Sequence, residues 1–137
     1  MHQSRSPRQV VEYYYDQVWA QRKPEIIVDL FADEYVNHAG ARGTLRGPTG
    51  IEQNYFSTLE AFPDVEMRLD TVLSEGDLVV ARYSMLGTHQ GMFMGVAPAS
   101  AAVNVPGIGI YRVSEGKIRE SWVVRDSLAL LRQIGGA

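Results

Sequence analysis

The spacing of apolar residues changes from helical to strand-like along the chain. In residues 10–18 the apolar side chains recur at helical spacing, which predicts an amphipathic helix that ends near Arg22. Ser6 and Gln9 form a capping box around Pro7, and proline is favoured at the first helical position. The first helix is therefore expected to begin at Pro7.

Two further helical segments follow. "PEIIVDLF" (24–31) predicts a short helix, after which "YVNHAG" (35–40) is expected to be extended. The stretch 41–50, "ARGTLRGPTG", is glycine-rich and predicted to be irregular. "GIEQNYFSTLEAF" (50–62) carries apolar residues on one helical face and ends before Pro63, which predicts a third helix.

Beyond Pro63 the apolar period becomes two, as in strands. Residues 65–76 and 77–91 are predicted to form a hairpin with a tight turn at Glu75-Gly76. Residues 102–126 repeat this pattern around a second turn, "SEGK". The segment between the hairpins, 92–101, is expected to be a loop of small residues with two methionines.

Helices followed by a meander of long antiparallel strands define the α+β class. We expect a cone-shaped α+β barrel, in which three N-terminal helices pack on a strongly curved antiparallel or mixed sheet and enclose a pocket. Gly107 and Gly109, inside a predicted strand, would allow the bending or close approach that such a sheet needs. The 137 residues contain no repeat or linker, so a single domain over residues 1–137 is expected.

The composition excludes several classes of partner and of catalytic site. A formal net charge of −3, from 13 basic and 16 acidic residues, argues against a nucleic-acid or anionic-membrane partner. The chain has no cysteine, which excludes a thiolate nucleophile and a cysteine zinc site. No signal peptide or membrane-spanning run is evident, so a cytoplasmic protein with a small partner is expected.

Several short patterns occur in a characteristic order. They are "FADEYVNHAG", "GPTGIEQNYFSTLEAFPDVEMRLDTVLSEGDLVVARYSMLGTHQGMFMGVAP" and "GIGIYRVSEGKIRESWVVRDSLALLRQIG". Over about residues 28–135 the chain resembles the SnoaL-like polyketide cyclase family. The resemblance implies the nuclear transport factor-like fold, also called cystatin-like, with a pocket between the bent sheet and the helices. It also implies that the Asp after the Trp of the last strand, Asp126, lies in the pocket as a general acid/base for intramolecular aldol closure.

Strand alternation alone places Asp126 on one face with Glu120, Trp122 and Val124. If Trp122 lines the pocket, Asp126 does too, and an apolar pocket would raise the pKa of its carboxyl group to a value useful for proton transfer. The alternative is that Asp126 caps the final helix, "SLALLRQIG", or pairs with an arginine.

His38 and His89 are the other catalytic candidates, since either could bind a substrate carbonyl or share a proton with Asp126. Each could equally be a loop histidine bonded to backbone. Two isolated histidines make a weak metal site, so no metal is expected. The candidate substrate-binding residues are Trp122, Tyr14 or Tyr15, Tyr35, Asn37, Arg82, Met92 and Phe93. Each of them also has an ordinary structural explanation, such as helix packing, an ion-paired strand residue or a pocket wall.

The sequence thus favours a cofactor-independent cyclase or isomerase that acts by general acid/base catalysis on a hydrophobic, carbonyl-bearing small molecule. An epoxide hydrolase or double-bond isomerase on the same fold is one alternative. A non-catalytic small-ligand-binding or dimerisation module is the other. The outer face of the sheet, with residues such as Ile110 and Val123, is expected to pair with a second copy as a homodimer.

Overall fold

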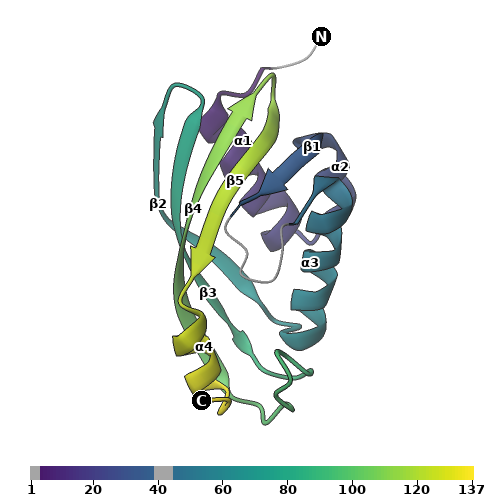
Figure 1. Ribbon diagram of the computed structural model, residues 1–137, viewed down its shortest axis with the longest axis vertical. Coiled ribbons are helices and arrows are strands. Elements are labelled where there is room, and N and C mark those ends of the chain that lie inside the picture. Colours follow the sequence, from purple (N-terminus) through teal and green to yellow (C-terminus); the bar gives the residue numbers. More distant parts are fainter. Residues whose placement is uncertain (1–3, 39–44) are drawn as a thin grey trace.

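The computed structural model describes residues 4–38 and 45–137, which form a curved five-stranded sheet with helices against one side (Figure 1). The strand order is β1-β5-β4-β3-β2; β1 runs parallel to β5, and the other pairs are antiparallel. The strands are β1 (Phe31–Asn37), β2 (Glu66–Glu75), β3 (Leu78–Thr88), β4 (Ala102–Ser114) and β5 (Lys117–Arg125). The helical segments are α1 (Pro7–Tyr13), the π-helix η1 (Tyr14–Ala20), the 3₁₀ turn η2 (Pro24–Ile26), α2 (Ile27–Leu30), α3 (Gly47–Ala61) and α4 (Ser127–Gln133). The predicted α+β fold is confirmed.

The N-terminal helix begins with the expected capping box. The Ser6 hydroxyl accepts a hydrogen bond from the Gln9 backbone N–H at 3.2 Å, and the Gln9 side chain accepts one from the Ser6 N–H at 2.9 Å. From Tyr14 onward the helix widens into η1, whose i→i+5 spacing is seen in the 2.9 Å bond from Gln21 N to Asp16 O. The apolar spacing of residues 10–18 did not predict this change in helix type.

Two predicted element boundaries differ from the structure. The second helix ends at Leu30, and Phe31, which we assigned to it, begins β1. Phe31 is almost fully buried, with its ring 4.9 Å from the rings of both Tyr14 and Tyr35, so tertiary packing favours the strand. The third helix begins at Gly47, ahead of Pro48, so it includes part of the segment predicted to be irregular; residues 41–44 of that segment lie outside the described residues.

Both hairpins are confirmed. Gly76 and Gly116 occupy the two turns with φ of 59° and 75°, where a left-handed backbone favours glycine. The β4–β5 ladder shifts register near Arg112, where Arg112 pairs with Glu120 and Val113 pairs with Ile118. Beyond this shift the residues of β5 alternate regularly, with Ser121, Val123 and Arg125 on the side of the helices.

Two glycines of β4 allow tyrosine rings to lie flat on the inner face of the sheet. A Cβ at Gly107 would overlap the ring of Tyr83 and lie 2.5 Å from its hydroxyl oxygen. A Cβ at Gly109 would lie 2.8 Å from Cε1 of Tyr111. Both rings are nearly buried against α1 and η1, so the two glycines are required by packing rather than by backbone conformation.

Replacing Gly107 by Ala is expected to lower the free energy of unfolding by about 1–3 kcal/mol, because the added methyl group displaces Tyr83. Urea denaturation measures this loss. Gly109→Ala should lower the free energy of unfolding by less, since a Cβ at Gly109 overlaps the Tyr111 ring less closely.

The matched control combines Gly107→Ala with Tyr83→Leu. If the ring is the cause, the two substitutions interact favourably and the double variant is more stable than the sum of the single effects. Strict additivity would contradict the packing explanation.

Candidate functional site

The inner face of the sheet carries a polar cluster among apolar side chains. Residues of β3, β4 and β5 alternate between the two faces, and the inward rows are buried or half-buried. On β5 the inward residues include Ser121, Val123 and Arg125, so the expectation that Val123 lies on the outer face is wrong. The polar members of the inner face are Tyr14, Tyr15, Tyr35, Tyr83, His89, Tyr111, Ser121 and Arg125.

Four of the interior tyrosines have hydrogen-bond partners on other elements or on the next helical turn. The hydroxyl groups of Tyr15 and Tyr111 share a hydrogen bond of 2.7 Å. The indole N–H of Trp19 donates to the Tyr14 hydroxyl at 3.1 Å, and the Tyr35 hydroxyl shares a 2.5 Å bond with Ser121.

Burial keeps these phenols neutral. It raises the pKa of Tyr35 to about 12 and raises the pKa values of Tyr14, Tyr15 and Tyr111 further. They are hydrogen-bonding groups at neutral pH rather than bases.

His89, just beyond β3, is fully buried, and neither ring nitrogen has a hydrogen-bond partner among the described residues. Its imidazole lies 5.5 Å from the ring of Phe62, which in turn lies 5.2 Å from Phe93. Its backbone is bonded to Ala101 and Ser100, at the far end of the loop that follows it. A buried imidazole without partners is costly in a protein interior and is common at sites that bind a ligand or move a proton.

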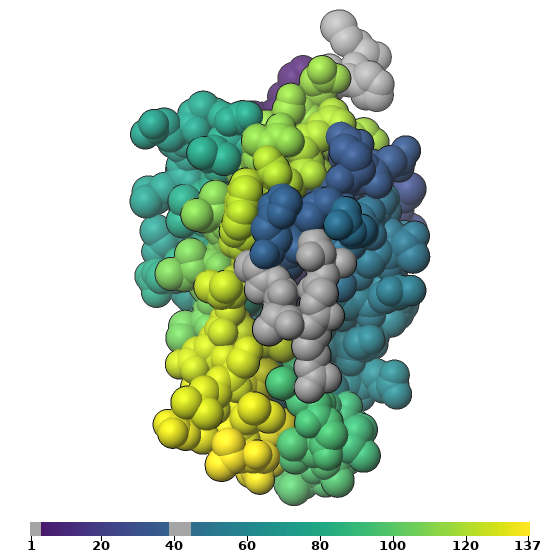
Figure 2. Space-filling model, viewed as in Figure 1, coloured from purple at the N-terminus to yellow at the C-terminus, as the bar shows by residue number. Residues whose placement is uncertain are grey.

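The loop 90–101 borders His89 and lies beside the C-terminal end of α4 (Figure 2). A Cβ at Gly136 would come 2.7 Å from a methyl group of Val96, which shows how closely the two segments pack. Met92 and Met94 of this loop are exposed, while Phe93 turns inward. The imidazole of His89 is therefore closed off from solvent by its surroundings.

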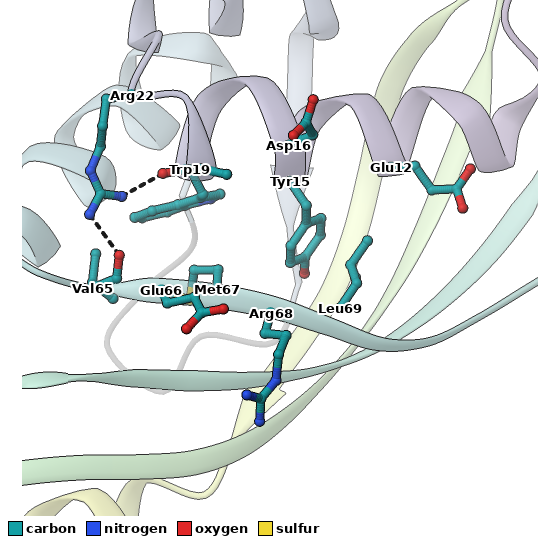
Figure 3. Close-up of a pocket in the computed structure, with 11 residues that line it drawn as sticks. Glu12, Tyr15, Asp16, Trp19, Arg22, Val65, Glu66, Met67, Arg68 and Leu69 are labelled. Atoms are coloured by element: carbon teal, nitrogen blue, oxygen red, sulfur yellow. Dashed lines mark hydrogen bonds between the residues drawn. The ribbon is translucent and has the colours of Figure 1, made fainter.

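A groove of about 440 Å³ runs between η1 and the edge strand β2 (Figure 3). Tyr15, Trp19, Met67 and Leu69 contribute its apolar lining. The guanidinium of Arg22 closes one end by donating to the carbonyl oxygens of Trp19 at 2.5 Å and of Val65 at 2.7 Å (Figure 3). Tyr15 links the groove to the interior cluster through Tyr111.

The prediction that Trp122 and Asp126 face a pocket is wrong. The two residues do share a face with Val124, but it is the outer one, where Trp122 is 38% exposed and Val124 is 58% exposed. Asp126 is exposed and caps α4, accepting a 2.9 Å hydrogen bond from the Ala129 N–H. The helix-cap alternative is therefore confirmed. The error arose from using a partly apolar outer row to decide which side is the interior.

His38 also lies on the outer side of the sheet. Its Nε2 is 2.8 Å from an oxygen of Glu120, whose other oxygen accepts a 2.7 Å bond from Arg112. Those two contacts, Arg112 first, lower the pKa of the Glu120 carboxyl group. The imidazole stacks on Trp122 at 5.1 Å. The expected partnership of His38 with Asp126 is not among these contacts.

The remaining candidates divide between the two faces. Tyr14, Tyr35 and Phe93 face the interior, and Asn37 accepts a 3.3 Å bond from the Val123 N–H. Arg82 is exposed on the outer face and donates to Thr71, and Met92 is exposed, so the prediction that these two contact a substrate in the pocket is not supported by their positions.

Sequence analysis missed Arg125, Tyr83 and Tyr111 as interior polar groups. Alternation correctly separated Arg125 from Trp122, so placing Trp122 outside would have placed Arg125 inside. The signal for the tyrosines was the pair of glycines in β4, which mark where rings lie close to the backbone.

No group of three His, Cys, Asp or Glu side chains within residues 4–38 and 45–137 is arranged to hold a metal ion. Of the helices in that same part of the chain, none has the length and apolar character to cross a membrane.

Comparison with known families agrees with this architecture. The model of the SnoaL-like polyketide cyclase family matches residues 9–134, which is most of the chain. The chain belongs to the SnoaL-like polyketide cyclase family.

Solved structures of candidate polyketide cyclases and of a candidate hydroxylase are similar to this chain in fold. IdmH from Streptomyces antibioticus, a candidate polyketide cyclase, is 27% identical with a TM-score of 0.84, and the match covers 96% of this chain and 99% of that one. AclR from Streptomyces galilaeus, a candidate hydroxylase, is 25% identical with a TM-score of 0.81, over 95% and 85% of the two chains. A candidate SnoaL-like cyclase from Jannaschia sp. CCS1, 23% identical with a TM-score of 0.85 over 99% of both chains, supports the fold. A search of curated proteins found no match.

Replacing Asp126 by Ala should lower the free energy of unfolding by about 1 kcal/mol, because the α4 N-cap is lost. Asp126→Asn is the matched control and should retain nearly full stability, since Asn caps helices as well as Asp does. Urea unfolding of both variants measures the effect; equal loss in Asn and Ala would contradict the assignment as a cap.

Proposed function

We propose that this chain is a cofactor-independent enzyme that moves a proton on a hydrophobic, carbonyl-bearing small molecule. Intramolecular aldol-type ring closure of a polyketide-like compound is the proposed reaction. Membership of the cyclase family and the similarity to IdmH support the reaction class. The observation that carries the proposal is the buried imidazole of His89, neither of whose nitrogens has a partner within residues 4–38 and 45–137.

In this proposal His89 replaces Asp126 as the proton-transfer group. The neutral imidazole takes a proton from the carbon next to a carbonyl, and the resulting enolate attacks a second carbonyl of the same molecule. The imidazolium then returns the proton to the new alkoxide oxygen, so the cycle is redox-neutral and needs no electron carrier. A histidine is suited to both steps because its ordinary pKa lies near neutral pH.

Proton abstraction can be tested without knowing the natural substrate. Aryl ketones and cyclic 1,3-diketones in D₂O exchange their α-protons when an enolate forms, and NMR follows the loss of signal. The wild-type chain should exchange at least one such compound faster than buffer does, and His89→Phe should reduce that rate by about 10²–10⁴-fold.

His38→Phe is the matched control, because it removes an imidazole from the outer face. Its exchange rate should equal that of the wild type. Unchanged exchange in His89→Phe would refute the role of His89.

A non-catalytic ligand-binding module is the second candidate. The capping role of Asp126 favours it, since that carboxylate is engaged in structure rather than available for chemistry. Binding of carbonyl compounds without any exchange above the buffer rate would support this candidate over the enzyme.

We further propose that the chain is a homodimer formed through the outer face of the sheet. This face presents an exposed apolar patch that is larger than isolated surface residues would give. Its members are Val80, Ile108, Ile110, Trp122 and Val124. Such a patch on β3, β4 and β5 is suited to a self-complementary two-fold contact.

Val124→Glu should convert the dimer to a monomer in sedimentation velocity, because a buried unpaired charge opposes association. Val28→Glu, at a similarly exposed position on α2, is the control and should leave the dimer intact. A wild-type chain that sediments as a monomer would refute the proposal.

A further inference from the structure

The inner face of β5 holds a cation that has no counter-charge in the part of the chain that the structure describes. The side chain of Arg125 is half-buried, and no carboxylate among the described residues forms an ion pair with it. Its one hydrogen bond within those residues is a weak contact of 3.9 Å to the sulfur of Met85, and its guanidinium lies 5.4 Å from the centre of the Phe93 ring. A guanidinium has five N–H donors and no acceptor, so almost all of its hydrogen-bonding capacity is unused.

Tyr83 supplies a second unused donor beside it. In the sheet register Tyr83 pairs with Gly107, and Gly107 pairs with Arg125, so the three residues form one row across β3, β4 and β5. The Tyr83 ring crosses above Gly107, and its hydroxyl oxygen lies 2.5 Å from where a Gly107 Cβ would be. The hydroxyl therefore points across β4 toward Arg125, and it makes no hydrogen bond with the residues described.

The two groups also influence each other electrostatically. Burial lowers the pKa of Arg125 and raises the pKa of Tyr83, while each side chain partly offsets the shift of the other. These opposite effects fit a guanidinium and a phenol that lie close together in an environment with little water.

An ordinary structural role explains this arrangement poorly. A cation over an aromatic ring contributes roughly 0.5–2 kcal/mol, whereas a desolvated charge without hydrogen-bond acceptors costs more than that. Other arginines of the same chain, the exposed Arg8 and the half-buried Arg112, pair with glutamates instead. What the row of Tyr83 and Arg125 lacks is an acceptor with negative charge.

We propose that Arg125 and Tyr83 form an anion subsite for a hydrophobic ligand that carries one ionised oxygen group, either a carboxylate or an acidic enol. Arg125 provides two parallel N–H donors in the geometry that suits such a group, and the Tyr83 hydroxyl donates a third bond. Met85 and Phe93 provide the apolar contacts. This inference rests on the proposed function in one respect: an enolate is the species that His89 would generate.

The subsite is tested by binding rather than by turnover. The probes are 2-naphthoate and its neutral isostere 2-naphthamide, each titrated into the full chain by isothermal calorimetry. The wild-type chain should bind the carboxylate about tenfold or more tightly than the amide, since charge-assisted bidentate hydrogen bonds distinguish the two.

Arg125→Met should abolish this preference, and Tyr83→Phe should reduce it several-fold. Arg132→Met is the matched control, because it removes the same charge from an exposed position on α4, and it should keep the preference. Arg125→Met should also be as stable as the wild type or more stable in urea, as expected when an uncompensated charge is removed.

Equal binding of the two probes, binding of neither at millimolar concentration, or a preference that survives in Arg125→Met would overturn the proposal. A clear loss of stability in Arg125→Met would do the same, since it would indicate a structural role. The test is independent of catalysis: failure of α-proton exchange in the wild type would refute the role of His89 and leave the anion subsite in place.

Discussion

The close approach of the Tyr83 ring to Gly107 determines how the inner face of the sheet is organised. Because β4 has no side chain at this point, the ring lies flat across the strand and its hydroxyl reaches toward β5. Gly109 gives the same freedom to Tyr111, whose hydroxyl then meets Tyr15 of η1 at 2.7 Å. The position of the Tyr83 hydroxyl near Arg125 and the bond between Tyr111 and Tyr15 both depend on these two missing side chains.

The interior that results is rich in donors and poor in charged acceptors. The phenols of Tyr15 and Tyr111 bond to each other and that of Tyr35 bonds to Ser121, so these buried hydroxyl groups have partners. His89 and Arg125 differ, because each lies inside the fold and leaves most of its hydrogen-bonding capacity unused among the residues that the structure describes. Natural proteins keep such groups where a ligand completes them, and that is the physical basis for placing function on this face.

Much of the fold could be predicted from the sequence, because its signals are local. Ser6 and Gln9 predicted the start of the first helix, and the glycines at the turns predicted both hairpins. The parallel pairing of β1 with β5 could not be predicted, since it joins segments more than eighty residues apart without a short connection. The strand at Phe31 was missed for a similar reason, as its ring is buried by Tyr14 and Tyr35 rather than by its neighbours in sequence.

The site was predicted less well because alternation defines two faces without saying which is inside. Trp122 seemed the better core residue, but it stacks on His38 on the outer face, and Asp126 follows it there as a helix cap. The family resemblance led to the same wrong face, because it matched Asp126 by its place in the motif, which does not show what surrounds the side chain. Arg125, one residue earlier, faces the interior.

A crystal structure of the chain grown with an aromatic carboxylate would test most directly which face of β5 is functional. We expect the carboxylate on the inner face, within hydrogen-bonding distance of the Arg125 guanidinium and the Tyr83 hydroxyl. A carboxylate bound on the outer face beside Trp122 and Asp126, with the space around Arg125 unchanged, would contradict the assignment of function to the interior.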